Sequence, residues 1–241
     1  MKLKICGMKY QDNMTEVAAL QPDYLGFIFY DKSARNFDTS MPQISNSIKK
    51  TGVFVNEDLD HVVEKINTFN LQAVQLHGEE SPEYCFKLKR HYEDQNDEVI
   101  SIKEADYHTS TPLSLIEKKS SNNGGVEIIK VFSIKDEFNF EVLKPYEAVC
   151  DYFLFDTKGK LPGGNGYTFD WSVLNNYPST KPFFLSGGIG LDQIEDIKKF
   201  QQSKASKYCY ALDVNSKFEI DPGLKNVKKL EGFKKSLSFR T

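Results

Sequence analysis

The sequence has no run of apolar residues near the ~18 that a membrane-spanning helix needs. Its first residues, MKLKICG, contain no long apolar stretch followed by a small-residue cleavage site, so we expect no secretory signal. The four cysteines are widely scattered and form neither a CxxC pair nor a spacing typical of a metal site. They are Cys6, Cys85, Cys150 and Cys209. We therefore expect reduced thiols, a cytoplasmic location and no bound metal.

An excess of positive charge is also missing. The 31 lysines and arginines are outnumbered by 34 acidic residues, which gives a formal net charge of −3. This balance argues against a general nucleic-acid or membrane binder, whereas a small anionic substrate remains possible because one site can be locally positive. With 241 residues, 39% of them apolar, the chain can form one sizeable core. Length alone allows one barrel-like domain or two smaller ones.

Short apolar runs recur along the chain and predict strands. Their residues show little strict alternation, as is typical of strands that are buried on both faces. Eight of them begin near residues 3, 24, 51, 73, 127, 152, 182 and 208, in the segments KLKICG, YLGFIFY, TGVFVN, AVQLHG, EIIKVFSI, YFLFDT, PFFLSGG and YCYALDVN.

Helical patterns lie between most of these runs. Asn56 is a candidate N-cap for one helix, and Ser81 followed by Pro82 is a candidate start for another. The segment LDQIEDIKKF predicts a third helix, with acidic residues early and lysines late. One face of this helix is expected to carry Leu191, Ile194, Ile197 and Phe200.

Alternation of strand and helix predicts a parallel sheet. Eight such units in this length predict an α/β fold, a closed (β/α)8 TIM barrel of eight parallel strands. The competing architecture is an open doubly wound sheet. A GxGxxG motif after the first strand would favour that sheet, and the motif is absent.

The gap between the fourth and fifth strands is about twice as long as the other gaps. We therefore expect a single barrel domain over 1–241 with a surface insertion over 92–125, between helix 4 and strand 5. Because it follows a helix, the insertion should emerge on the face opposite the active site. A competing assignment makes EVISI the fifth strand, although VEIIKVFSI is longer and more apolar.

In such a barrel, residues at the carboxyl ends of the strands face the active site. None of those found here is specific alone, since a strand-end cysteine is often an inert core residue and Gly-Gly is often a tight turn. Together they supply a potential base, a potential acid, a guanidinium and a glycine turn. They are Cys6, Arg35, Gln75, His77, Asp156, Gly187, Gly188 and Asp213.

Seven segments that contain these residues or lie beside them occur in the following order along the chain: KICGMK, GFIFYDKSARNF, GVFVNE, VQLHGEES, FLFDTKGKLPGGNGYTFDW, FFLSGGI and ALDVNSKFEIDPGLKN. Over nearly the whole chain except the insertion, this order resembles the phosphoribosylanthranilate isomerase family of tryptophan biosynthesis. The resemblance implies a (β/α)8 barrel without cofactor. It also implies an Amadori rearrangement of N-(5-phosphoribosyl)anthranilate to 1-(2-carboxyphenylamino)-1-deoxyribulose 5-phosphate.

The resemblance implies a role for two residues in proton transfer. Asp156 matches the family's general acid, which protonates the ring oxygen of the sugar so that the ring opens. Cys6 matches the general base, which removes the proton from sugar carbon two. Thiolate is the competent form, and a nearby positive charge or helix N-terminus can lower the pKa of a thiol.

The resemblance also implies how substrate is bound. Arg35 matches an arginine that holds the anthranilate carboxylate, which a guanidinium can clasp with two hydrogen bonds. Phosphate is expected at the loops after strands seven and eight. The remaining substrate-binding residues are Gln75, His77, Gly166, Gly187, Gly188, Asp213 and Asn215, of which His77 could equally be structural.

Three positions depart from the family pattern, namely Ala34, Asn165 and Lys217, where proline, threonine and glycine are common. Lys217 puts the detail of the phosphate turn in question. Two other functions stay open: another phosphosugar isomerase on the same barrel, against which the position of Cys6 argues, or a non-catalytic binding protein of this fold. We expect a small-molecule substrate and either a monomer or a homodimer.

Overall fold

The computed structural model describes residues 1–92, 125–135, 137–157 and 170–237, and within them eight parallel strands close into a barrel in chain order. The predicted strand starts are confirmed to within two residues. An open sheet is excluded because the last strand pairs with the first. The strands are β1 (Lys2–Ile5), β2 (Tyr24–Phe29), β3 (Lys49–Phe54), β4 (Ala73–Leu76), β5 (Glu127–Ile134), β6 (Tyr152–Thr157), β7 (Phe183–Leu185) and β8 (Cys209–Val214).

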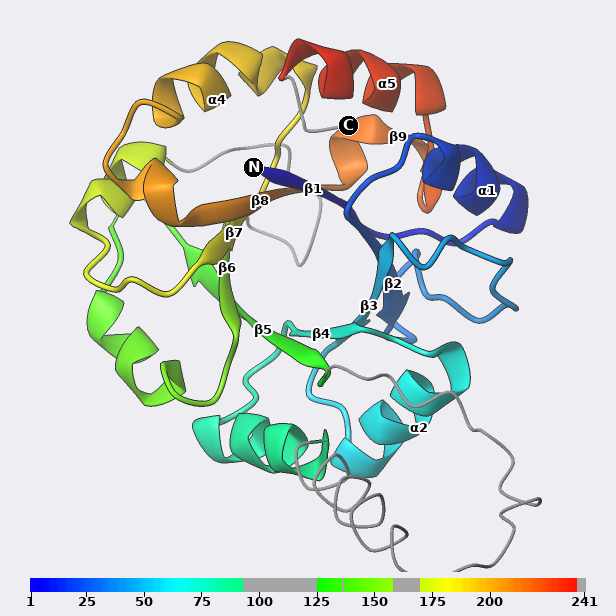
Figure 1. The fold of residues 1–241 in the computed structure, drawn as a ribbon, viewed down its shortest axis with the longest axis horizontal. Helices are drawn as coiled ribbons and strands as arrows, with labels where there is room; N and C mark the ends of the chain where they lie inside the picture. Colours follow the sequence, from blue (N-terminus) through cyan, green and yellow to red (C-terminus); the bar gives the residue numbers. More distant parts are fainter. Residues whose placement is uncertain (93–124, 136, 158–169, 238–241) are drawn as a thin grey trace, which may run out of the picture.

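Helices surround the barrel (Figure 1). The α-helices are α1 (Gln11–Ala19), α2 (Leu59–Phe69), α4 (Ile194–Phe200), α5 (Val227–Ser236) and a helix over 82–92. Short 3-10 helices are η2 (Phe140–Tyr146), η3 (Trp171–Asn176), η4 (Leu191–Gln193), η5 (Ala205–Tyr208) and η6 (Ser216–Phe218). A small antiparallel hairpin, β9 (Glu219–Asp221) with β10 (Leu224–Lys225), follows η6.

The two predicted helix starts have different outcomes. Ser81 Oγ accepts the backbone N–H of the residue three positions later at 3.2 Å, so it caps the helix over 82–92 as predicted. The assignment of Asn56 as an N-cap is wrong, because α2 begins after Asp58. Asn56 has a positive φ of 52° and its side-chain oxygen accepts the backbone N–H of Glu79 at 2.6 Å. It therefore ties together the loops that follow β3 and β4.

The predicted apolar face of the third helix is correct only in part. Ile197 and Phe200 are buried against the barrel, whereas Leu191 is 42% exposed. Leu191 belongs to the 3-10 turn η4, which winds with about 3.0 residues per turn. Because of this tighter winding, the Leu191 side chain does not lie on the buried face that an α-helical period of about 3.6 residues predicts.

Two apolar clusters build the core. The larger one joins strand residues to helix residues such as Met14, Val62 and Ile197, so it lies between the sheet and the surrounding helices. The smaller cluster alternates with it along the strands, since Leu154 belongs to the smaller and its neighbour Phe153 to the larger. Because successive strand side chains point to opposite faces, this second cluster fills the inside of the barrel. Its members are Tyr24, Ala73, Ile129, Val131, Leu154, Phe184 and Ala211.

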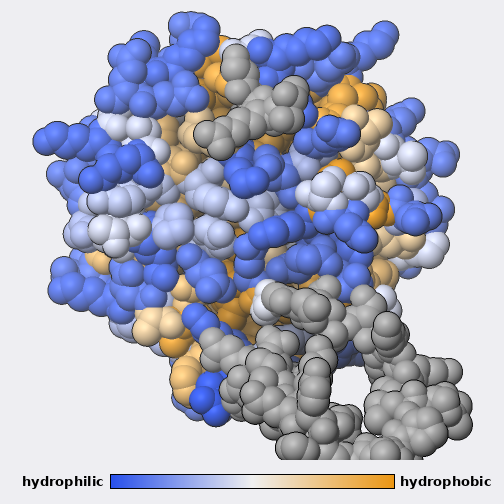
Figure 2. Space-filling model, in the orientation of Figure 1, coloured by the Kyte–Doolittle hydropathy of each residue, from blue (hydrophilic) through white to orange (hydrophobic). Residues whose placement is uncertain are grey.

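The strand that follows β4 in the barrel is β5, which lies within the predicted segment VEIIKVFSI and pairs with β4 in the register Ala73↔Glu127. The competing segment EVISI lies outside the described residues. Most of the expected insertion over 92–125 lies outside the described residues, so its surface location stays a prediction. None of the described helices is long and apolar enough to cross a membrane. The face seen in Figure 2 is mostly hydrophilic, with apolar surface in separate patches.

Candidate active site

A pocket lies at the carboxyl ends of the strands. Its empty volume is about 750 Å³, including its open mouth. It gathers predicted residues from β1, β4, β6, β7 and β8, which are far apart in the sequence. Eight of the ten predicted site residues line it: Cys6, Gln75, His77, Asp156, Gly187, Gly188, Asp213 and Asn215.

Cys6 lies just beyond β1 and is 4% exposed. A Cβ added to Gly26 on the neighbouring strand would lie 2.7 Å from Cys6 Sγ, so the glycine makes room for the thiol. Burial raises the pKa of the Cys6 thiol above its ordinary value, although the Lys4 ammonium acts to lower it. A nearby cation is therefore present, but its effect on the pKa of the thiol is smaller than that of burial.

Lys4 is positioned by strand register. It precedes Cys6 by two residues, and the pairing of β1 with β8 sets it directly opposite Asp213. Its Nζ donates to Asp213 Oδ1 at 2.9 Å, and both side chains are almost fully buried. Burial acts to lower the pKa of Lys4, but Asp213 and Cys6 outweigh it and the pKa is raised. A charged lysine is thus held next to the thiol.

Asp156 lies near the end of β6, and 24% of its side chain is exposed. Its Oδ2 is 3.4 Å from His77 Nε2, which follows β4. His77 also donates its backbone N–H to Phe54 O at 2.8 Å, so the turn that carries it is fixed to β3. The candidate acid therefore faces both the pocket and an imidazole.

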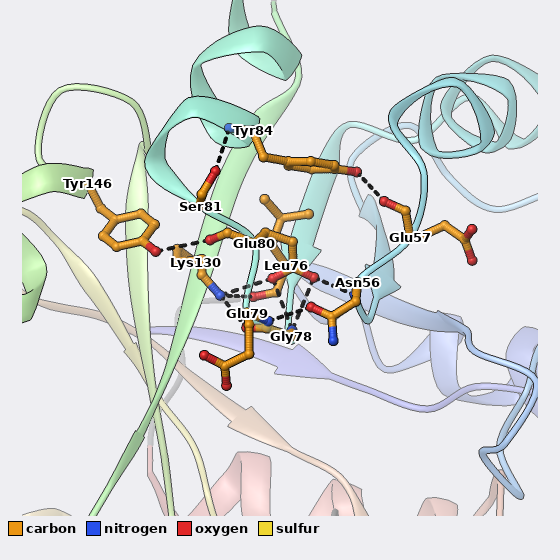
Figure 3. A network of polar contacts seen from close by, with 10 residues as sticks. All are labelled: Asn56, Glu57, Leu76, Gly78, Glu79, Glu80, Ser81, Tyr84, Lys130 and Tyr146. Carbon is orange, nitrogen blue, oxygen red and sulfur yellow. Dashed lines mark hydrogen bonds and ion pairs between the residues drawn. The ribbon is translucent and has the colours of Figure 1, made fainter.

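The turn after β4 is held by a buried ion pair (Figure 3). Lys130 Nζ lies 3.0 Å from Glu80 Oε2 and donates to Gly78 O at 2.7 Å. Glu80 in turn accepts the backbone N–H groups of Gly78 and Asn56. These bonds immobilise the residue after His77, and breaking such a buried pair is costly because one charge would be left uncompensated.

The two glycines after β7 adopt backbone conformations that favour glycine. Gly187 has φ of 90° and Gly188 has φ of 67°. A Cβ on Gly187 would lie 2.1 Å from Thr157 Oγ1, so no other residue fits there without displacement. The backbone of this turn is therefore open to close approach by a ligand.

Arg35 does not line the pocket, in contrast to the other catalytic and binding candidates that the structure describes. Its Nε donates to Glu219 Oε1 at 2.8 Å and its Nη2 to Glu219 Oε2 at 2.7 Å. Burial acts to raise the pKa of Glu219, but hydrogen bonding to Arg35 and the charge of Lys225 lower it overall.

The ion-pair cluster of Arg35, Glu219 and Lys225 lies next to the pocket. Lys225 Nζ donates to Glu219 Oε1 at 2.8 Å and to Asn215 Oδ1 at 2.6 Å, and Asn215 lines the pocket. A Cβ added to Gly7 would meet both Asn215 and Arg35, at 2.7 and 3.0 Å. Arg35 therefore lies at the edge of the pocket, on the side of Gly7 and Asn215.

Sequence reasoning missed the buried charges Lys4, Glu219 and Lys225. A signal existed for Lys4, since a lysine two residues before Cys6 in a short buried strand shares its face. Gly166 lies outside the described residues, so its predicted role stays a prediction. Among the described residues, no group of three or more histidine, cysteine or acidic side chains could hold a metal ion.

Comparisons with known proteins agree on one family. The family model for N-(5'-phosphoribosyl)anthranilate (PRA) isomerase matches residues 3–116 and 108–236. The curated N-(5'-phosphoribosyl)anthranilate isomerase of Parabacteroides distasonis is 37% identical, covering 97% of this chain and 91% of that protein. Its counterpart in Phocaeicola vulgatus is 34% identical over 94% and 92% of the two chains.

Solved structures give the same result for the fold. The crystal structure of phosphoribosyl anthranilate isomerase from Thermotoga maritima superposes with a TM-score of 0.71 at 26% identity, covering 99% of this chain and 98% of that one. The enzyme from Thermus thermophilus gives a TM-score of 0.72 at 22% identity, with the same coverage. The barrel, the matched family model and the curated relatives together show that this chain belongs to the phosphoribosylanthranilate isomerase family.

Proposed function

We propose that the chain catalyses the Amadori rearrangement of N-(5-phosphoribosyl)anthranilate to 1-(2-carboxyphenylamino)-1-deoxyribulose 5-phosphate, in tryptophan biosynthesis, with Asp156 as general acid and Cys6 as general base. The observation that carries this proposal is that both residues line one pocket at the carboxyl ends of the strands. The reaction needs an acid and a base that act on neighbouring atoms of one substrate. It needs no external oxidant or reductant, because the product is an isomer of the substrate.

The first step is opening of the furanose ring. Asp156 donates its proton to the ring oxygen while the anilino nitrogen pushes electrons toward carbon one. The carbon–oxygen bond breaks and an iminium cation forms. Asp156 lines the pocket from the end of β6, so its carboxyl can reach the ring oxygen of a sugar bound there.

The second step is removal of the proton on carbon two. The Cys6 thiolate accepts this proton, and the electron pair neutralises the iminium to give an enolamine, which tautomerises to the ketone. Burial raises the pKa of the Cys6 thiol, so nearby positive charge is needed to favour the thiolate. Lys4 supplies one such charge, and the iminium itself supplies a second, present only when the base is needed.

The two other functions considered predict different behaviour. Another phosphosugar isomerase of this fold would leave N-(5-phosphoribosyl)anthranilate unchanged, and so would a non-catalytic binding protein. The buried lysine next to Cys6 favours the isomerase, because a purely structural core cysteine needs no charged neighbour. Turnover of this substrate, followed by loss of anthranilate fluorescence, separates the three.

Arg35 is proposed to bind the anthranilate carboxylate. Glu219 holds its Nε and Nη2, and within the described part of the chain Nη1 has no hydrogen-bond partner. Arg35→Ala is expected to raise KM about 10- to 100-fold with a much smaller change in kcat, since a hydrogen bond to a charged group contributes about 1.5–3 kcal/mol. Steady-state kinetics check this, with Arg90→Ala as a surface control. An unchanged KM in Arg35→Ala would rule out the carboxylate contact.

The insertion is proposed to be dispensable for chemistry. The helix over 82–92 precedes it and β5 follows it, so it is an α-to-β connection, and such connections lie at the end of a barrel opposite the active site. Replacement of Glu93–Asn123 by a short glycine-containing turn should leave kcat and KM unchanged. Stability should change little, because doubling a loop costs only about 0.6 kcal/mol. A folded deletion variant with greatly reduced activity would contradict this placement.

We propose a cytoplasmic location, where the four buried, unpaired cysteines would stay reduced. Either a monomer or a homodimer is compatible with the proposal. One solved structure of the Thermotoga maritima enzyme contains monomers of a dimeric phosphoribosylanthranilate isomerase. Analytical ultracentrifugation of this chain distinguishes the two states.

A further inference from the structure

Lys217 lies in η6, in the loop that follows β8, and lines the pocket together with the glycine turn after β7. Among the described residues that line this pocket, it is the one lysine or arginine. The lining also contains two acidic residues, Asp156 and Asp213, which would repel a dianionic ligand. Lys217 is therefore the lining residue best suited to attract such a ligand.

The other cations close to the pocket already have buried acidic partners. Lys4 pairs with Asp213 at 2.9 Å, and Lys225 pairs with Glu219 at 2.8 Å. Arg35 also pairs with Glu219, at 2.7 Å. Withdrawing Lys4 toward a ligand would leave Asp213 uncompensated in a buried position, which is costly. Arg35 or Lys225 would have to give up charge-assisted hydrogen bonds to the buried Glu219.

Lys217 has a different kind of partner. Its Nζ lies 3.3 Å from Asp192 Oδ2, and the two side chains are 31% and 60% exposed. A solvent-exposed ion pair of this kind contributes little to stability, so the lysine can exchange Asp192 for another anion. A Cβ on Gly190 would lie 3.0 Å from Lys217 Cβ, so the stem of the lysine packs on the loop after β7.

We propose that Lys217 binds the phosphate group of the substrate, leaving Asp192 when the phosphate enters the turn formed by Gly187 and Gly188. This inference rests on the proposed function, which supplies a phosphorylated substrate. A phosphate monoester carries about −1.5 to −2 charges at pH 7. The long flexible stem and point charge of lysine suit a partner that is present only in the complex.

Inorganic phosphate is the probe for this contact. We expect Lys217→Gln to raise the inhibition constant of inorganic phosphate and the KM for substrate each by about tenfold, with kcat changed less than threefold. Lys217→Arg should stay within about threefold of the wild type. Asp192→Asn should lower the inhibition constant, because it removes the anion that competes for Lys217.

A matched control separates the local contact from loss of overall charge. Lys198 is an exposed lysine on α4 that pairs with Glu195, as Lys217 pairs with Asp192, and it does not line the pocket. Lys198→Gln removes the same charge and should change neither constant. If Lys217→Gln keeps both constants within twofold of the wild type, or if Lys198→Gln shows the same tenfold effect, the proposal is wrong.

Failure of the proposed function would look different. A folded wild-type chain without turnover would remove the isomerase assignment, whereas calorimetric titration with inorganic phosphate would still measure the Lys217 contact. Weaker phosphate binding by Lys217→Gln in that titration would then support the anion contact alone. Equal binding by the wild type and Lys217→Gln would overturn it.

Discussion

Cys6→Ala is expected to lower kcat by about 10²–10⁴-fold, the usual contribution of a general base, while the protein folds normally. The thiol is buried between β1 and β2, and alanine keeps the backbone and removes only the sulfur. Because the residue accepts a proton in the transition state, kcat and kcat/KM should fall together. Stopped assays of initial rate with circular dichroism of the same sample check both parts of this expectation.

Cys209→Ala is the matched control for this variant. Cys209 is also a buried strand cysteine, with Sγ 3.7 Å from Ala211 O, but it does not line the pocket. It should therefore keep the wild-type kcat at a similar cost in stability. Near-native kcat in Cys6→Ala, or an equal loss in Cys209→Ala, would remove Cys6 from the role of base.

The pH profile adds a signature that a structural role would not produce. Thiolate is the active form, and burial raises the pKa of Cys6, so the fraction of thiolate in the free enzyme grows as pH rises. The value of kcat/KM should accordingly increase with pH through the neutral and mildly alkaline range. In Cys6→Ala this rise should be absent.

Asp156→Asn is expected to have an effect of the same size, about 10²–10⁴-fold on kcat. Asparagine has nearly the shape of the acid but cannot release a proton to the ring oxygen. The side chain is partly exposed and lies 3.4 Å from the partly exposed imidazole of His77, so among the described residues the change leaves no buried charge without a partner and should not unfold the barrel. Steady-state kinetics should show a fall in kcat with a small change in KM.

Asp196→Asn serves as the control for Asp156→Asn, because Asp196 is an exposed acid on α4 that pairs with Lys199 at 3.5 Å. It should behave as the wild type. An Asp156→Asn variant that retains wild-type turnover would mean that the ring oxygen receives its proton from another donor, and His77 would be the first residue to test.

Much of the barrel could be predicted because its strands are buried on both faces. Such strands read as continuous apolar runs, and each predicted start lies within two residues of the observed one. The strand ends then brought Cys6, Asp156 and Gly187 to one pocket, since the carboxyl ends of parallel strands meet at one end of a closed barrel.

Other features depend on contacts between distant parts of the chain. Arg35 and Glu219 form their ion pair across 184 residues of sequence, so no local pattern reveals it. Asn56 has the residue type of an N-cap, yet its side chain bonds the loop after β4. The pKa of Cys6 depends on how deeply the thiol is buried, a quantity that the tertiary structure alone supplies.

Turnover by the purified full chain tests the proposed roles of Cys6 and Asp156 most directly. N-(5-phosphoribosyl)anthranilate is added, and loss of anthranilate fluorescence is followed with the wild type, Cys6→Ala and Asp156→Asn in parallel. We expect saturable turnover by the wild type, a product of unchanged mass that separates from the substrate by chromatography, and rates reduced at least 100-fold in both variants. A folded wild type that leaves the fluorescence unchanged, or variants as fast as the wild type, would contradict these roles.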